Sequence, residues 1–428
     1  MTLHLRGTLV CVGALAIGTG RRDVRSDQPV LADQRGLPVI PGSSLAGALR
    51  AAAVRVHDAE TVERLMGPST IGGEDPAERS AVSVHDAVLD LPGLVPPRQL
   101  RQHVGIDRER LAAQEAVKFD RETWPLGLRF RLALSLEGGG TEELVDPLLL
   151  ALAELTGPLG GIGSGRCPVA IEDLTVHRAA AAADVLAAAE RRWDHPEEPE
   201  PLGASIRGPV DLDAPDGPGQ GGVEGTTAAV ELRLRLRTLS PLLVREPASP
   251  FEQAEDNVPF SVRCVEGAAA SARVVRRPAV PGDSLLGVIR QRAERALALA
   301  GLPGGDPFDD LRAEDRDLAH PVLRTFGLVG SAEDSASGAV RVEDAVLVDR
   351  AQDDGVWVEG VDRTAGEQAW AVVRPRVHID RLTSAPLGSA KFDDTALADG
   401  RDLEVRITVA PSGRSFDDLD LALVAVGL

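Results

Sequence analysis

The 428-residue chain has few residues of the kinds that stack on nucleobases, form disulfides or cross membranes. Tyrosine is absent, aromatic residues make up 3% of the chain, and the three cysteines are Cys11, Cys167 and Cys264. Because the cysteines lie far apart without a CxxC pair, we expect a reducing, cytoplasmic setting and no cysteine-based zinc site. No run of about 18 apolar residues exists, so no membrane span is expected.

The charge argues against a generic nucleic-acid-binding protein, whose surface should be basic. The formal net charge is −20 at pH 7. It is unevenly spread, because residues 1–56 contain seven arginines and three aspartates and therefore carry +4. A local basic surface can coexist with this acidic chain. The scarcity of aromatic residues predicts that any grip on a nucleic acid rests on phosphate, sugar and shape rather than on base stacking.

Internal repetition organises the sequence. Four motifs of the first half recur in the same order in the second half. They are PGSSLAGALR (41–50) with PGDSLLGVIR (281–290), VSVHDAVL (82–89) with VRVEDAVL (340–347), VGIDR (104–108) with VHIDR (377–381), and KFD (118–120) with KFD (391–393). This order predicts two domains of like fold, 1–178 and 229–428. Between them, residues 179–228 are predicted to form an Ala-rich helix (178–193) and a linker rich in Pro, Gly and Glu.

The first half has the pattern of a β-α-β-β-α-β unit. Alternating apolar positions predict strands, and apolar positions three and four residues apart predict helices. The expected strands are 3–18, 80–90, 126–137 and 167–178, and the expected helices begin near residue 43 and at residue 142. The second half has comparable segments but no counterpart of the glycine-rich segment before the last strand. The predicted fold class is α+β, with two tandem ferredoxin-like, RRM-like domains.

Two interpretations stay open for the glycine-rich segment GPLGGIGSGR (157–166). It follows a predicted helix and opens a strand, which is the reverse of a dinucleotide-binding fingerprint, and it lacks the Gly-Lys-Ser/Thr of a P-loop. It is either a tight turn that needs positive φ or a nest of backbone N–H groups that holds phosphate. Its candidate binding residues are Gly160, Gly161, Gly163, Gly165 and Arg166.

The helix after Pro41 offers a second candidate anion site. Ser43 or Ser44 can cap this helix whatever its function. A helix N-terminus also attracts anions, and Arg50 lies two turns further along, where it can reach a phosphate or an acidic neighbour. The equivalent arginine of the second half is Arg290.

The loop 18–40 holds a cluster of charges. Arg21, Arg22 and Arg25 crowd around two aspartates, of which Asp27 is followed by Gln-Pro-Val. The charges either pair among themselves in a solvated loop or place a carboxylate beside phosphate-binding arginines. The second arrangement would suit Mg²⁺ binding or the transfer of a 2′-hydroxyl proton.

The polar segment 98–123 lies between two predicted strands, and its motifs recur in the second half. Long excursions in compact domains are usually functional. The segment contains Lys118 and also His103, the histidine that we consider as an acid or base. The eight histidines show no HxxxH or HxH grouping and no GxSxG occurs, so neither a histidine metal site nor a nucleophilic triad is expected.

Taken together, these motifs resemble the RAMP superfamily. The resemblance rests on Asp27-Gln28-Pro29-Val30, LPVIPGSSLAGALR (37–50), the VGIDR and KFD segment, and LGGIGSGR (159–166). It is greatest to the CRISPR type III backbone subunits that polymerise along a guide RNA. It covers essentially all of the first half, and the second half more loosely.

The resemblance implies roles for particular residues. Asp27 matches a loop aspartate that is required for metal-dependent cleavage of bound target RNA, with Asp256 as its counterpart in the second half. The metal would be Mg²⁺ or Mn²⁺, and no zinc is expected. Residues 98–123 match a thumb hairpin that wedges into the guide–target duplex. Guide RNA is expected at Arg21, Arg22, Arg25, Ser43, Ser44, Arg50, Lys118, Gly160, Gly161, Gly163, Gly165, Arg166 and Arg290.

The expected partners are therefore a guide crRNA, a target RNA and other CRISPR effector subunits. Some family features are missing, because Ala46 and Ala48 stand where relatives carry lysine, and Ser43 is replaced by Asp283 in the second half. Whether the chain is itself an enzyme stays open. The alternatives are a non-catalytic guide-binding scaffold and a metal-independent endoribonuclease that processes guide RNA.

Overall fold

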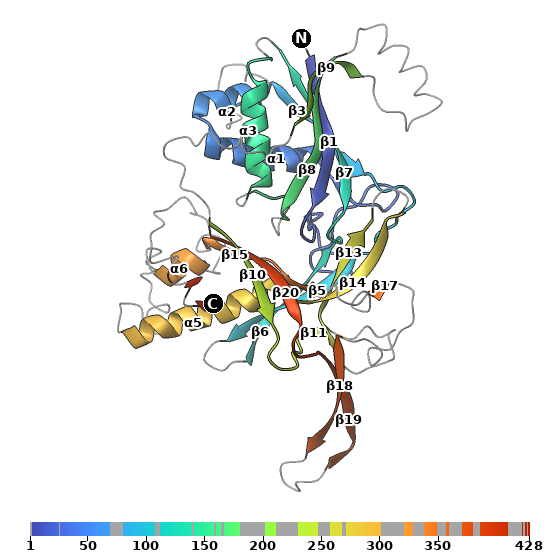
Figure 1. Cartoon of the computed structure of the whole chain (residues 1–428), viewed down its shortest axis with the longest axis vertical. Coiled ribbons are helices and arrows are strands. Elements are labelled where there is room, and N and C mark those ends of the chain that lie inside the picture. Colours follow the sequence, from blue (N-terminus) through green and yellow to red (C-terminus); the bar gives the residue numbers. More distant parts are fainter. Residues whose placement is uncertain are drawn as a thin grey trace. The chain divides into compact units, whose positions relative to one another are not determined.

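A computed structural model of the chain (Figure 1) shows two compact units. One unit is Met1–Thr226 with Cys264–Val274, and the other is Thr227–Arg263 with Val275–Leu428. The structure describes residues 2–24, 26–68, 80–107, 112–138, 141–157, 160–163, 167–179, 202–210, 230–246, 257–267, 271–300, 321–327, 338–348, 357–358, 370–379, 386–409, 422, 424–425 and 427–428.

The first unit is built on an antiparallel sheet in the order β2-β4-β7-β1-β8-β9, with β3 also paired to β7. The run β8-β1-β7-β4 is the fourth-first-third-second strand order of a ferredoxin-like β-α-β-β-α-β unit. The predicted α+β, ferredoxin-like fold is therefore confirmed. The strands are β1 Thr2–Cys11, β2 Val39–Ile40, β3 Val82–Val84, β4 Ala87–Leu89, β7 Arg129–Glu137, β8 Val169–Ala179 and β9 Leu202–Val210.

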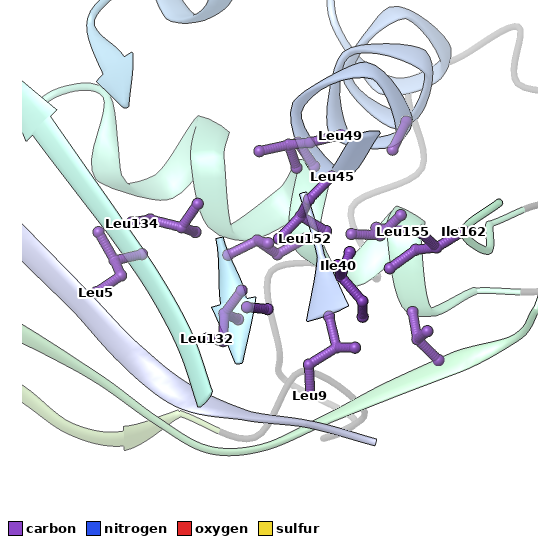
Figure 2. Packing of buried hydrophobic residues seen from close by; sticks show 14 of the residues in the cluster. Leu5, Leu9, Ile40, Leu45, Leu49, Leu132, Leu134, Leu152, Leu155 and Ile162 are labelled. Carbon is purple, nitrogen blue, oxygen red and sulfur yellow. The ribbon is translucent and has the colours of Figure 1, made fainter. Parts of the chain in front are cut away.

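Helices α1 (Gly42–Val56), α2 (Ala59–Met66) and α3 (Val145–Thr156) cover one face of this sheet (Figure 1). Their apolar residues recur at the spacing of one helical face, which turns a stripe of leucines toward the strands. Figure 2 shows these leucines meeting the inward side chains of β1 and β7. Full burial of each leucine contributes roughly 1.5–3 kcal/mol relative to exposure. The core includes Leu5, Leu9, Leu45, Leu49, Leu132, Leu134, Leu152 and Leu155.

Part of the range predicted as a linker is a strand. β9 lies inside 179–228 and pairs antiparallel with β8, so it covers an edge that would otherwise expose backbone N–H and C=O groups. Its sequence LGASIRGPV contains two glycines and a proline, which depress strand propensity and conceal it from pattern reading. The Ala-rich helix expected over 178–193 lies, beyond the end of β8, outside the described residues.

The polar insertion 98–123 forms a β-hairpin, as the family resemblance implied. β5 (Gln99–Asp107) pairs antiparallel with β6 (Ala112–Thr123) in a two-stranded sheet of its own. The second unit has the same element, formed by β18 (Ala371–Ile379) and β19 (Pro386–Leu397) (Figure 1). These two elements are called the first hairpin and the second hairpin below.

The second unit repeats the fold with a sheet in the order β10-β20-β16-β14-β13. Helix α5 (Gly282–Ala300) corresponds to α1 in the repeat, and α6 (Pro321–Phe326) follows it. The short strand pair is β11 (Arg245–Glu246) with β12 (Val258–Pro259). The remaining strands are β10 Val230–Arg237, β13 Ser261–Glu266, β14 Arg273–Val280, β15 Val340–Val342, β16 Ala345–Leu347, β17 Trp357–Val358 and β20 Asp402–Val409.

The two central strands β1 and β10 differ in their surroundings. β1 lies between β7 and β8, whereas within the described part of the second unit β10 pairs with β20 alone. The leucines of the two strands reflect this difference. Leu3, Leu5 and Leu9 of β1 are fully buried, while the alternate leucines of β10 are only half-buried.

Both long helices begin at a glycine because the backbone of the neighbouring strand passes too close for a side chain. A Cβ at Gly42 would collide with the carbonyl oxygen of Val84, and one at Gly282 would collide with that of Val342. In each domain, the aspartate two residues after that strand carbonyl accepts a hydrogen bond from the first residue of the helix. The Gly42 N–H donates to the Asp86 carboxylate at 2.7 Å, and the Gly282 N–H donates to Asp344 at 2.9 Å.

This close approach predicts opposite effects for two glycines of α1. We expect Gly42→Ala to lower the free energy of unfolding by about 1–3 kcal/mol through overpacking. The matched control is Gly47→Ala, since nothing lies within 4 Å of a Cβ there, and alanine should stabilise the helix by about 0.5–1 kcal/mol. Urea denaturation of the full chain measures both changes. Equal effects of the two substitutions would contradict this account.

Candidate RNA-binding site

The loop that carries Asp27 runs beside the base of the first hairpin. Gly18 and Val30 close the loop through an antiparallel bridge, and Gln28 forms a parallel bridge with Arg121 of β6. The Glu122 N–H donates to the Gln28 carbonyl at 3.0 Å, and Arg121 Nε donates to the Gln28 side-chain oxygen at 2.7 Å. The loop therefore lies against β6 like a third, short strand.

Asp27 and Asp120 bind each other reciprocally. The Asp27 N–H donates to Asp120 Oδ1 at 2.8 Å, and the Asp120 N–H donates to Asp27 Oδ2 at 3.2 Å. The other oxygen of Asp27 lies 3.9 Å from Arg22 Nε, and the Asp27 side chain is 38% exposed. The arrangement fixes a carboxylate in one orientation at the surface, beside an arginine whose side chain is 85% exposed.

Neighbouring residues hold the loop in this position. The Ser26 N–H donates to Asp23 Oδ1 at 3.0 Å, and the buried Ser26 hydroxyl accepts the Gln28 N–H at 3.1 Å. Such local side-chain bonds replace a regular hydrogen-bond ladder. Asp23 therefore belongs to the support of the loop, and Asp27 is the aspartate that faces the arginine.

Below the loop lies a buried charge that sequence reasoning did not single out. Glu122 Oε2 accepts the Val30 N–H at 3.1 Å and lies 3.3 Å from Arg98 NH1. The Arg98 guanidinium stacks 5.1 Å above the Trp124 ring, and the Trp124 indole donates to the Leu31 carbonyl at 3.0 Å. The sequence offered one signal for this buried group, because Asp120, Glu122 and Trp124 belong to the repeated KFD motif and its extension, KFDRETW (118–124).

The second unit repeats the same contact. Asn257 forms a parallel bridge with Asp394, as Gln28 does with Arg121, and its side-chain amide donates to Asp394 Oδ1 at 2.8 Å. Asp394 follows the second KFD motif directly, at the position of Arg121. Asp256, the predicted counterpart of Asp27, lies outside the described residues. The two bridges show that Asn257 is the counterpart of Gln28.

The helix start that was predicted as an anion site already has a protein carboxylate. Asp86 accepts the first N–H of α1, and Asp344 does the same for α5. Ser43 is exposed and Ser44 is half-buried, and the N-cap of α1 has no side-chain hydrogen bond. A phosphate at Ser43 would therefore lie near a negative charge, which weakens the helix dipole as an argument for RNA binding there.

Arg50 and Arg290 have structural partners. Arg50 NH2 donates to the carbonyls of Met66 and Gly67 at the C-terminus of α2, at 2.5 and 2.6 Å. Arg290 donates in the same way to the Gly327 carbonyl after α6 at 2.9 Å. Cations at the C-terminal end of a helix satisfy carbonyls and complement the helix dipole. Holding the next helix accounts for both arginines without RNA.

Two glycines of the glycine-rich segment are required by packing. A Cβ at Gly160 would overlap the Leu155 carbonyl oxygen. Gly163 has a φ of +78°, and a Cβ there would collide with the Ala16 carbonyl oxygen. Ile162 and Cys167 close a turn with two backbone bonds of 2.9 and 2.8 Å. This part of the segment therefore has the contacts that a tight turn requires. Gly161 has φ +121°, whereas Gly165 and Arg166 lie outside the described residues.

Cys11 and Cys167, far apart in the sequence, meet in the core under this turn. The hydrogen bond with Cys167, together with burial, raises the pKa of the Cys11 thiol well above its usual value. The Cys167 thiol itself donates to the Gly13 carbonyl at 3.1 Å. The Cys11 thiol is therefore a packing group that stays protonated at neutral pH.

The remaining candidates are divided between the loop and the hairpin. Arg21 is exposed, like Arg22, while Arg25 lies outside the described residues. Lys118 is exposed on β6, opposite Val104 in the hairpin register. The structure thus brings Asp27, Arg21, Arg22 and Lys118 to the loop and hairpin, whereas Ser43, Arg50 and the glycines belong to the helical layer and its turns.

The fold brings together three histidines that lie far apart in the sequence. His4 Nδ1 and His85 Nε2 lie 3.1 and 3.2 Å from the Ser135 hydroxyl, and His177 faces His4 in the strand register. Strand pairing brings these residues together from positions up to 173 residues apart, which no local motif can reveal. Two imidazoles beside one hydroxyl are capable of proton transfer.

The carboxylates of Asp27 and Asp120 could bind a divalent cation only if a substrate supplied further ligands. One oxygen of Asp27 and one of Asp120 already accept a backbone N–H. Across the residues that the structure describes, no group of three His, Cys, Asp or Glu side chains could hold a metal ion. Mg²⁺ is commonly held by one or two carboxylates together with substrate phosphates. The pair fits that mode and does not fit an all-protein cage.

These features define a tandem ferredoxin-like protein in which each domain has a hairpin and a backbone bridge to it, from Gln28 in the first domain and Asn257 in the second. The RAMP superfamily model matches residues 8–167 and 235–409. The chain therefore belongs to the RAMP superfamily and is a CRISPR-associated RNA-binding protein. Among curated proteins, no relative matches the chain. No helix within the described ranges is long and apolar enough to cross a membrane.

The contacts of Arg50 predict that its loss affects folding rather than RNA. We expect Arg50→Gln to lower the free energy of unfolding by about 1–3 kcal/mol, because the carbonyls of Met66 and Gly67 lose a charged donor. RNA affinity should stay unchanged at a temperature where the variant is folded. Urea denaturation and fluorescence anisotropy with labelled RNA measure the two properties. A variant of unchanged stability that binds RNA weakly would assign Arg50 to the RNA site instead.

Proposed function

We propose that this chain is a backbone subunit of a CRISPR type III effector complex. Its two tandem RAMP domains bind the guide RNA backbone, and the loop of Asp27 takes part in metal-dependent cleavage of the target RNA. Asp256 has the corresponding role in the second domain. Target RNA, guide crRNA and further effector subunits are the partners of this function.

The observation that carries the proposal is the fixed carboxylate of Asp27. Reciprocal bonding with Asp120 leaves this side chain 38% exposed and beside Arg22. A folded domain that needed Asp27 only for structure could bury it. The same kind of bridge recurs between Asn257 and Asp394, so each domain has a backbone bridge from this position to its hairpin.

The reaction is an internal transesterification of RNA. The ribose 2′-oxygen bonds to the adjacent phosphorus while the bond from phosphorus to the next 5′-oxygen breaks. The 2′-hydroxyl proton passes to a base and the leaving 5′-oxygen gains a proton, which gives a 2′,3′-cyclic phosphate and a 5′-hydroxyl end. Asp27 orients the reacting nucleotide and does not act as the nucleophile, while Arg22 stabilises charge on the phosphate.

Asp27 and Asp120 would hold a divalent cation together with a phosphate of the target. When bound, such a cation polarises phosphoryl oxygens and offsets the charge that develops on them. Two other functions remain in competition. A non-catalytic scaffold is favoured by the absence of a three-ligand cluster in the described part of the chain, and a metal-independent nuclease is favoured by the pair His4 and His85 beside Ser135.

Substitution of the two loop aspartates tests cleavage. We expect Asp27→Asn to slow target cleavage about 10²-fold or more, because the amide keeps an acceptor for the Asp120 N–H but loses the charge. Asp256→Asn should remove cleavage at a different position of the target, and the double variant should remove both. Denaturing gels of end-labelled target RNA in the assembled complex measure the products.

The control is Asp33→Asn, a loop aspartate whose carboxylate only accepts bonds from its own turn. It should leave cleavage intact, and all variants should retain guide RNA. Full cleavage by the double variant would make the chain a scaffold. Cleavage that persists in EDTA but is lost in His85→Ala would identify the metal-independent nuclease.

A further inference from the structure

The buried carboxylate of Glu122 holds the loop three residues after Asp27. Its Oε2 accepts the Val30 N–H at 3.1 Å and lies 3.3 Å from NH1 of Arg98, which reaches it from the surface with 38% of its side chain exposed. A buried carboxylate is costly unless hydrogen bonds and a counter-charge compensate it. The Glu122 carboxylate, the Arg98 guanidinium and the Val30 N–H therefore act as one unit, which is called the loop brace below.

The loop brace lies on the same face of β6 as the partner of Asp27. Asp120 and Glu122 are two residues apart on the strand, so their side chains point to the same side. Asp120 accepts the Asp27 N–H at 2.8 Å, and Glu122 accepts the Val30 N–H. The four-residue stretch from Asp27 to Val30 is thus held at both ends by carboxylates of one strand. Release of the Val30 end would leave the direction of the Asp27 side chain less firmly fixed.

The second domain allows the two charged members of the loop brace to be compared residue by residue. Both hairpins share one register when they are counted from their KFD motifs. In this register Glu122 aligns with Thr395, which is fully buried, and Arg98 aligns with Ala371. The second domain therefore has neither the carboxylate nor its counter-charge.

The donor of the loop brace is missing from the second domain as well. The loops align through the bridges that Gln28 and Asn257 make to the two hairpins. Two residues after these bridges, Val30 aligns with Pro259. Proline has no backbone N–H, so no acceptor is needed at that position. Donor, acceptor and counter-charge are thus replaced together, as expected of groups that depend on one another.

The second domain keeps the bridge from Asn257 to Asp394 without a loop brace, so placing a loop against a hairpin does not require one. We infer that Glu122, paired with Arg98, is a positioning residue for RNA cleavage in the first domain, where it holds the loop so that the Asp27 carboxylate keeps one direction. The inference rests on the proposed function. It adds a difference between the domains, because cleavage in the second domain has no such buried charge to depend on.

Glu122 acts through the loop and not on the RNA, because its side chain is buried. Its loss should therefore lower the rate of the bound complex and leave the affinity for target RNA unchanged. A reacting group displaced by about 1 Å can lose about 10²-fold in rate. This split between rate and affinity distinguishes a positioning residue from one that binds the target.

The test measures cleavage of end-labelled target RNA by the assembled complex at saturating target. We expect Glu122→Ala to slow the cut of the first domain, identified as the one lost in Asp27→Asn, about 10- to 100-fold. The cut of the second domain should keep its rate in the same reaction, and the affinity for target RNA should stay unchanged. Glu122→Gln keeps an acceptor for the Val30 N–H and should give an intermediate rate.

Two further variants separate positioning from stability. Glu154→Gln removes the charge of another partly buried ion pair, which joins Glu154 of α3 to Arg55 of α1, and it should leave both cuts unchanged. Arg98→Gln should slow the first cut, and its combination with Glu122→Gln should be no slower than the slower single variant, because the two side chains act as a pair.

Equal slowing of both cuts by Glu122→Ala, or a loss of target affinity that accounts for the slower cut, would overturn the inference. If Glu122→Ala does not assemble, Glu122→Gln decides, and an unchanged first cut in that variant would overturn it too. The proposed function would survive these results as long as Asp27→Asn removes the first cut. A complex in which Asp27→Asn leaves both cuts intact would overturn the cleavage function, and the positioning role with it.

Discussion

Two carboxylates of like charge lie side by side at Asp27 and Asp120 because each accepts the backbone N–H of the other residue. Hydrogen bonds to a charged acceptor stabilise by roughly 1.5–3 kcal/mol, which offsets the repulsion between the side chains. The bonds fix three things at once: the path of the loop, the base of the first hairpin and the direction of the Asp27 side chain. The chemistry of this surface depends on that register, because a shift of one residue on β6 would turn Asp120 to the other face.

The repeated motif PGxSLxGxxR is explained by packing in both domains. Its first glycine admits the neighbouring strand, the aspartate after that strand binds the helix start, and its arginine holds the C-terminus of the next helix. The same contacts recur at Gly282, Asp344 and Arg290. Repetition therefore identified the fold correctly. The contacts of the motif join helix, strand and helix in both domains, and its role as an anion site stays a prediction.

Sequence reasoning reached the order of strands and helices and the tandem ferredoxin-like fold, because periodicity and repetition act locally. The hairpins were expected from the family resemblance, and the role of Asp27 stays a prediction. It did not reach Asp120, Glu122 or the meeting of His4 with His85. A carboxylate in an alternating polar strand has the same pattern whether it faces water or a loop, and only the register distinguishes the two. β9 was missed for a related reason, since its pairing with β8 outweighs the low strand propensity of its glycines and proline.

Charge explains how so acidic a chain can still bind RNA. On β10 the exposed arginines are matched by carboxylates of β20, with Arg235 3.4 Å from Glu404 and Arg237 2.7 Å from Asp402. The bond from Arg237 lowers the pKa of Asp402, so this pair stays ionised and neutral as a whole at physiological pH. Such pairs contribute little long-range attraction. The attraction is left to exposed cations at the loop and hairpin, such as Arg21, Arg22 and Lys118. Because that set is small among the residues that the structure describes, selective binding has to come from geometry, above all from a carboxylate held in one direction.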